Sequence, residues 1–131
     1  MHLTWAGLKA LSKENIIELR FRRRHVKPGW HDWRRMLCTN ATYVLNSAPG
    51  HIALHFRAPT HPPVVIEAQY NMVCMWDLMW QEYRYVSCEA VDVVTVIPVK
   101  TKEEQDSFWQ YFNNYLQSLS PQQKLTFMNR G

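Results

Sequence analysis

A basic segment with interleaved tryptophans, residues 22–35 (RRRHVKPGWHDWRR), is the part of this sequence best suited to binding chemistry. Guanidinium groups bind phosphate and indole rings stack on bases, so the segment suits contact with RNA or with an anionic lipid surface. The residues expected to make this contact are Arg22, Arg24, Arg34 and Arg35. The alternative is a solvated strand end and helix start on either side of Pro28-Gly29, because neighbouring strand residues point to opposite faces.

Histidine and cysteine side chains give no metal or catalytic pattern. His51 and His55 would lie about 13 Å apart on a strand, which is too far to share one ion. His25 and His31 flank the Pro-Gly corner, but no Cys or carboxylate motif accompanies them. Cys38 stands beside apolar residues, which favours a buried, inert thiol over a nucleophile. We therefore expect no catalytic residues, no cofactor and no metal.

Composition favours one ordered domain over residues 1–131. Hydrophobic residues make up 47% of the chain, enough for a core. Three cysteines form no paired spacing, which favours free thiols in a reducing compartment. A net charge of +4 favours anionic partners. We expect no transmembrane segment, and no secretion, because the N-terminus lacks the apolar region of a signal peptide.

Four extended segments are expected to build the sheet. Residues 16–24 alternate apolar and charged side chains, which is typical of a half-buried strand. Residues 51–70 predict a hairpin, with prolines in the APTHPP turn. Residues 90–99 are β-branched and apolar, which favours a fourth strand.

Four helices are expected beside these strands. Residues 3–12 predict a short helix, and a helical spacing of apolar residues runs from Trp30 to the SAPG stretch at 47–50. Residues 72–85 carry a methionine and aromatic stripe at helical spacing. Residues 102–119 predict a C-terminal helix, with Thr101 and Glu104 as a capping box.

The expected fold class is therefore α+β, a ferredoxin-like β-α-β-β-α-β antiparallel sheet with extra helices at both ends. Its core covers residues 16–99. The two internal helices would cover one face of the sheet. The other face would need a cover, either from the terminal helices or from a second copy of the chain.

The segments 16–37 (IIELRFRRRHVKPGWHDWRRML) and 48–86 resemble the dimeric α+β barrel superfamily, in its antibiotic-biosynthesis-monooxygenase-like and NIPSNAP-like groups. The resemblance rests on a strand followed by Lys-Pro-Gly and a helix, then on a Pro-Gly before the second strand. It also rests on Tyr70, Trp76 and Met79 or Trp80 at the aromatic positions. It implies two sheets that close into a barrel across a homodimer.

The catalytic residues that the resemblance implies are largely missing. Haem-degrading members carry an Asn on the first strand, where this chain has Glu18, Arg20 and Arg22. Trp80 matches the family's Trp, but the SCEAVDV stretch at 87–93 has no His after the second helix. Cofactor-free members act on quinols and polyketides through pocket shape, a class that stays open as an alternative.

Aromatic residues exceed what one helical stripe needs to pack a core. Trp76 and Trp80 would span a wide arc of the helix at 72–85, while Trp109 and Tyr111 lie off the main stripe of the last helix. Aromatic side chains are enriched at protein interfaces. We therefore expect Trp76, Trp80, Trp109 and Tyr111 to bind a partner.

These features favour a non-enzymatic structural or accessory subunit that docks within a larger multiprotein assembly. A small, basic, Trp- and Met-rich chain suits a mitochondrial assembly, respiratory or ribosomal, with a cytoplasmic location as the alternative. One alternative function is a small cofactor-independent monooxygenase or isomerase, with Trp80, Tyr70 and His55 lining a pocket for a hydrophobic aromatic substrate. A second is an RNA-contacting ribosomal protein that uses Arg20–Arg24 and Arg34-Arg35.

Overall fold

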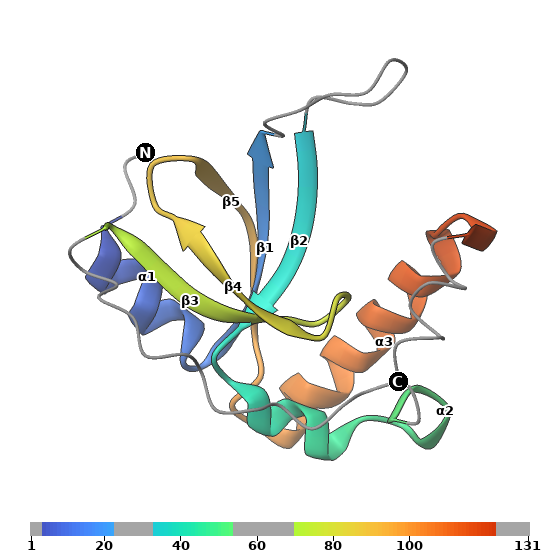
Figure 1. Ribbon diagram of the computed structural model, residues 1–131. Coiled ribbons are helices and arrows are strands. Elements are labelled where there is room, and N and C mark those ends of the chain that lie inside the picture. Colours follow the sequence, from blue (N-terminus) through green and yellow to red (C-terminus); the bar gives the residue numbers. More distant parts are fainter. Residues whose placement is uncertain (1–3, 23–32, 54–69, 123–131) are drawn as a thin grey trace.

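The computed structural model describes residues 4–22, 33–53 and 70–122. Helices lie at both ends of this part of the chain and strands lie between them (Figure 1). In chain order the elements are α1 (Trp5–Ser12), β1 (Asn15–Arg22), β2 (Trp33–Thr39), the 3-10 helix η1 (Thr42–Ser47), α2 (Gly50–Ala53), β3 (Met72–Asp77), β4 (Glu82–Ser87), β5 (Val91–Pro98) and α3 (Lys102–Ser118).

The five strands form one antiparallel sheet in the order β4-β3-β2-β1-β5. β1 pairs with β2 on one side and with β5 on the other, for example Ile17 with Cys38 and with Val96. The predicted α+β class, with an antiparallel sheet and a helix at each end, is confirmed, and it is consistent with a ferredoxin-like fold. Three predicted elements differ from those in the structure.

Apolar residues form two core clusters, one on each face of the sheet. Alternation along β1 sends Ile16 to the first cluster and Ile17 and Leu19 to the second. The first cluster packs against α3, η1 and α2, and the second packs against α1 (Figure 1). The buried members of the first cluster are Ile16, Leu37, Ala41, Val44, Ile52, Trp76, Leu78, Val99, Phe108, Trp109 and Phe112. Those of the second are Leu8, Ile17, Leu19, Met36, Cys38, Val73, Met75, Val86 and Cys88.

Both terminal helices begin at a capping threonine. Thr4 accepts a hydrogen bond from the Gly7 backbone N–H at 3.0 Å at the start of α1. The predicted capping box of α3 is complete, because Thr101 and Glu104 each accept the other's backbone N–H. Such caps satisfy backbone donors that have no partner within the first turn of a helix.

The helix predicted over 72–85 is wrong, because this segment forms β3, a tight turn and β4. β3 is an inner strand whose residues from Val73 to Asp77 are all buried, so it is enclosed on both faces. A strand buried on both faces reads as a continuous apolar run and not as an alternating one. Its periodicity cannot be distinguished from that of a buried helix.

The helix predicted from Trp30 is also wrong in the part that the structure describes. Trp33–Thr39 is β2, which is followed by η1 over Thr42–Ser47. Pairing with β1 overrides the local helical spacing, since Met36 and Leu37 serve opposite clusters. The first strand of the hairpin predicted over 51–70 is helical at its start, in α2. Most of that hairpin, residues 54–69, lies outside the described residues.

The terminal helices cover part of both sheet faces, one helix on each. α1 supplies Leu8 to one face, while α3 supplies Phe108 and Phe112 to the other. The edge strand β5 nevertheless keeps exposed apolar side chains. Among the described residues, no helix has the length and apolar character to cross a membrane.

Candidate functional site

The turn between β3 and β4 is built around the buried carboxylate of Asp77. Its Oδ1 accepts the backbone N–H groups of Met79 and Trp80 at 2.9 and 3.1 Å. The Gln81 N–H donates to the Asp77 carbonyl at 2.7 Å, and Gln81 takes a φ of 56°. Asp is favoured in such turns because its side chain binds backbone donors two or three residues ahead. A turn without Gly or Pro is therefore held in place by one acidic side chain.

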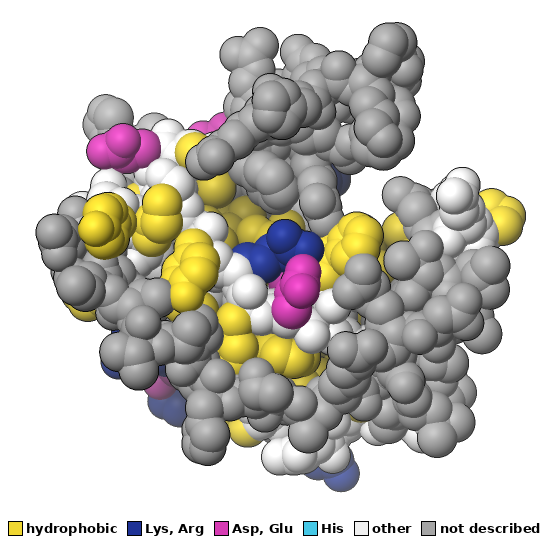
Figure 2. Space-filling view, viewed as in Figure 1, with side chains coloured by type: hydrophobic (Ala, Val, Ile, Leu, Met, Phe, Trp, Pro, Cys, Tyr) yellow, Lys and Arg dark blue, Asp and Glu magenta, His cyan; other side chains and the backbone are white. Residues whose placement is uncertain are grey.

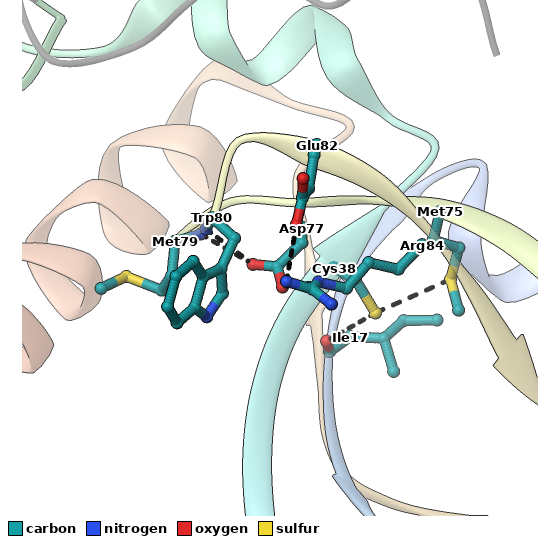
Figure 3. A network of polar contacts seen from close by, with 8 residues as sticks. All are labelled: Ile17, Cys38, Met75, Asp77, Met79, Trp80, Glu82 and Arg84. Carbon is teal, nitrogen blue, oxygen red and sulfur yellow. Dashed lines mark hydrogen bonds and ion pairs between the residues drawn. The ribbon is translucent and has the colours of Figure 1, made fainter. Parts of the chain in front are cut away.

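Arg84 on β4 completes this network (Figure 3). Its Nε donates to Asp77 Oδ2 at 2.9 Å, and its Nη2 donates to Glu82 Oε1 at 2.7 Å. The guanidinium carbon also lies 5.7 Å from the centre of the Trp80 ring, which is a cation–π distance. On the face shown in Figure 2, basic and acidic side chains meet near the centre, with hydrophobic side chains around them. This arginine is therefore engaged by its own hairpin.

Cys38 lies close to this network, in the second cluster. Its Sγ is 3.7 Å from the Ile17 carbonyl and 3.8 Å from Met75 Sδ (Figure 3). Burial raises the pKa of the Cys38 thiol well above its ordinary value, and the nearby charge of Asp77 raises it further. The thiol is therefore protonated, which fits the predicted inert role. Cys74 and Cys88 are also buried, and neither forms a disulfide bond.

A second buried carboxylate, Glu18 on β1, joins the sheet to α3. It accepts a hydrogen bond from the Tyr111 hydroxyl at 3.2 Å and from Arg35 Nη1 at 3.4 Å. Burial raises the pKa of Tyr111, and the charge of Glu18 and its hydrogen bond raise it further. Tyr111 is therefore neutral at physiological pH and acts as the donor. The arrangement stabilises helix docking and neutralises the buried charge of Glu18.

Arginines meet across the β1–β2 hairpin, which the sequence alone does not reveal. Arg20 lies directly opposite Arg35, Phe21 opposite Arg34, and Arg22 opposite Trp33. Arg20 also forms an exposed ion pair with Asp92 of β5, at 3.2 Å. Of the four predicted basic contact residues, the structure thus brings Arg22, Arg34 and Arg35 onto three neighbouring rungs. The fourth, Arg24, lies outside the described residues.

The outer edge of the sheet at β5 is apolar and partly exposed. Val94 is 41% exposed and Val96 is 39% exposed. Val94 is the extra residue where the β1–β5 register shifts, since Glu18 pairs with Thr95 and Leu19 with Val93. The single charge on the strand, Asp92, is already paired with Arg20. Among the described residues, no strand pairs with the outer side of β5.

A shallow open groove of about 380 Å³ lies between α3 and the segment around α2. Its apolar lining includes Ile52 and Trp109, and the Trp109 Nε1–H donates to Ser47 Oγ at 3.1 Å. Within the part of the chain that the structure describes, no group of His, Cys, Asp and Glu side chains could hold a metal ion. The residues that line this groove are Ser47, Pro49, Ile52, Asp106, Trp109, Gln110 and Asn113.

The four aromatic residues predicted to bind a partner are placed in two different ways. Trp76 and Trp109 are expected at a partner surface, but the structure buries both in the first cluster. They therefore pack against this chain's own core. Trp80 is half-buried beside Arg84, and Tyr111 is partly exposed above Glu18. Trp109 is buried because α3 packs on η1 as well as on the sheet.

The residues suspected of lining an enzyme pocket do not converge in the described structure. Tyr70 is exposed before β3, and Trp80 lies at the β3–β4 turn. Neither belongs to the groove beside α3. His55 lies outside the described residues.

Sequence reasoning missed the two buried carboxylates, Asp77 and Glu18, and the exposed valines of β5. Asp77 follows an apolar run and precedes Arg84 by seven residues, a spacing that gives no signal without the turn. Glu18 sits at an alternating position of a predicted strand, where a charged residue is expected to face solvent. Its burial depends on α3, which lies far away in the sequence.

Comparison with protein-family models, curated proteins and solved structures gives no match. The resemblance to dimeric α+β barrel proteins therefore stays a prediction. The helix that this resemblance places after Pro28-Gly29 is strand β2 over Trp33–Thr39. Function is consequently inferred from the surfaces and contacts of this chain alone.

Proposed function

We propose that this protein is a non-enzymatic accessory subunit that docks within a larger multiprotein assembly through the edge strand β5. The observation that carries the proposal is the exposure of Val94 and Val96 on an unpaired edge of the described sheet. Natural proteins usually protect such edges with charges, or cover them with another element. An exposed apolar edge is thus typical of a site where another polypeptide binds.

The composition of β5 fits a protein partner. Five of its eight residues, in VDVVTVIP, are valine or isoleucine. Burying an aliphatic side chain contributes about 25 cal/mol per Å² of apolar surface removed from water. Asp92 offers little repulsion to a partner, because Arg20 already neutralises it at 3.2 Å.

Backbone geometry limits how a partner strand could pair here. The Val99 N–H donates to the Glu14 carbonyl, so by alternation Ile97 faces β1 and the backbone of Val96 faces outward. The backbone of Pro98 also faces outward, but proline has no N–H to donate to a partner strand. The irregular register at Val94 interrupts the ladder on the other side. A partner would therefore contact the side chains of Val94 and Val96, and it would form backbone hydrogen bonds only at Val96.

The proposed location is a mitochondrial assembly, respiratory or ribosomal. Support for it comes from composition: a small chain with a net charge of +4, six tryptophans and six methionines. Cell fractionation of a tagged full-length chain tests it. Enrichment with the mitochondrial fraction is expected, and recovery in the cytosolic fraction would favour the cytoplasmic alternative.

Native gel electrophoresis of extracts from the source cells, with a tagged chain, tests the docking proposal. The wild type should migrate far above a chain of this length. The double variant Val94→Thr/Val96→Thr keeps the β-branched shape but removes apolar surface, so it should shift to the position of the free chain. A matched control is Leu11→Thr/Tyr43→Thr, which changes two residues of similar exposure (37% and 42%) outside the sheet. This control should stay in the assembly.

Circular dichroism of the purified variants checks that both are folded. The proposal fails if the β5 variant is folded and still migrates with the assembly. It also fails if the native wild type runs alone as a homodimer with an extractable ligand, which would favour the enzyme alternative.

A further inference from the structure

Positive charge is concentrated in the β1–β2 hairpin. Residues 20–35 contain seven Lys and Arg residues and a single acidic residue, Asp32. The rest of the chain therefore has eight basic and ten acidic residues, because the totals are 15 and 11. One hairpin thus accounts for more than the entire net charge of +4. Such segregation is an electrostatic signature of an anion-binding element.

The register gathers part of this charge on one face. Residues directly opposite each other on antiparallel strands share a face, and so do residues two positions apart along a strand. Arg20 and Arg35 are opposite each other, and the next rung on the same face pairs Arg22 with Trp33. This face therefore holds three arginine positions and one tryptophan position. Arg34, opposite Phe21, belongs to the other face.

This arrangement is unfavourable for an isolated hairpin. Like charges directly opposite on neighbouring strands destabilise the pair. Glu18 and Asp92 each compensate one arginine, through Arg35 at 3.4 Å and Arg20 at 3.2 Å. The Arg35 and Arg20 side chains nevertheless stay 61% and 45% exposed, so solvent still reaches both side chains. Their cationic surface remains accessible to an anion.

We propose that this face of the β1–β2 hairpin, which we name the arginine face (Arg20, Arg22, Trp33 and Arg35), binds the phosphate backbone of a nucleic acid. Arg20 and Arg22 are two residues apart, about 6.6 Å along β1, so they can contact successive phosphates of an extended strand. Trp33 occupies the register position opposite Arg22, and aromatic residues among basic ones are typical of proteins that bind single strands.

The arginine face is separate from the docking edge, and the inference does not rest on the docking proposal. Its test uses fluorescence anisotropy of labelled single-stranded RNA, with single-stranded and duplex DNA of the same sequence as parallel arms. Vesicles containing anionic lipid form the last arm. The wild type should bind, and log K should fall linearly with log salt, because each bound phosphate releases counterions.

The test variant is Arg20→Gln/Arg22→Gln, which leaves Arg35 in place to pair with Glu18. The salt slope should fall by about 1.4 for single strands, or about 0.7 for each phosphate that is no longer bound, and Kd should rise at least about tenfold. The charge-matched control is Lys13→Gln/Lys102→Gln, at two exposed positions outside the hairpin. It should leave the slope within error of the wild type. Arg20→Lys/Arg22→Lys keeps both charges and should retain most of the slope.

Tighter binding of RNA than DNA would support the proposal and identify RNA as the source of the phosphates, and the reverse would identify DNA. Equal weakening of binding in the test and control variants would overturn it, because net charge alone would then explain binding. Binding to vesicles but to no nucleic acid would also overturn it, as would no binding by the wild type. Circular dichroism must show the variants folded, and the Lys-substituted variant keeps the test decisive if the Gln variant unfolds.

Discussion

The two hairpins of the sheet use arginine in different ways. In the β3–β4 hairpin, Arg84 is held by Asp77, Glu82 and the Trp80 ring. In the β1–β2 hairpin, Arg20 and Arg35 lie opposite each other across the strands, and their side chains are 45% and 61% exposed. The first hairpin surrounds its arginine with acidic groups of its own. In the second, Arg20 and Arg35 each pair with one acidic residue and still remain exposed to solvent.

This difference separates a structural role from a binding role. A partly buried arginine that satisfies a fully buried carboxylate is costly to remove, because the carboxylate is then left unpaired. An exposed ion pair contributes little to stability. The β3–β4 arginine is therefore expected to maintain the fold, and the β1–β2 arginines are expected to be available to a ligand.

The largest expected effect is at Asp77. Asp77→Ala removes the acceptor for two backbone N–H groups and leaves Arg84 without its buried partner, so the free energy of unfolding should fall by about 3–5 kcal/mol. Urea titration measures this decrease. Glu82→Ala removes the exposed partner of the same arginine and should cost less than about 1 kcal/mol. Similar decreases for the two variants would show that the turn does not depend on its buried carboxylate.

The free energy of unfolding should fall at alkaline pH because of Cys38, which lies where the β1–β2 and β3–β4 hairpins pack together. Its pKa is raised by burial and by Asp77, so the unfolded thiol ionises first, above about pH 8.5. The contribution of the protonated thiol to stability is complete below that pH. As the pH rises further toward the folded pKa, the free energy of unfolding falls by about 1.4 kcal/mol per pH unit. Cys38→Ala should reduce this slope in urea titrations between about pH 8 and pH 10, even if packing lowers its stability at neutral pH. An unchanged slope would mean that the Cys38 thiol ionises as readily in the folded chain.

A smaller effect is expected at the base of the β1–β2 hairpin, where Glu18 meets Tyr111. A double-mutant cycle with Glu18→Gln and Tyr111→Phe should give a coupling energy of about 1 kcal/mol, because the hydrogen bond involves a charged acceptor. The pKa of Tyr111 is raised, so this stabilisation is complete below about pH 10 and disappears at higher pH. Coupling near zero at neutral pH would show that α3 docks through its apolar residues alone.

Elements with a clear local signal were predicted correctly from the sequence. β1 follows from alternation, β5 from its β-branched residues, and α3 from its capping box. The strand β3 reads as a helix because burial on both faces removes the alternation that marks a strand. The strand β2 reads as a helix because its apolar residues have helical spacing, which pairing with β1 overrides. The turn after β3 uses Asp77 and a positive φ at Gln81 in place of Gly or Pro, so no usual turn residue marks it.

The candidate sites are also hard to predict from the sequence, because they are formed by residues that lie far apart in the chain. The arginines of residues 22–35 were identified by composition, but only the register shows that Arg20 and Arg35 face each other. Trp76 and Trp109 were expected at an interface because a single helical stripe has no room for them. The core has room because β3 and α3 pack on the same cluster.

The contrast between the hairpins is tested most directly by the free energy of unfolding of Arg84→Gln and Arg20→Gln, measured by urea titration at the same ionic strength. Arg84→Gln should be destabilised by about 3 kcal/mol or more, because Asp77 becomes a buried and poorly paired charge. Arg20→Gln should be destabilised by less than about 1 kcal/mol, since its pair with Asp92 is exposed. Equal destabilisation, or a larger effect at Arg20, would contradict the assignment of one arginine to the fold and the other to a ligand.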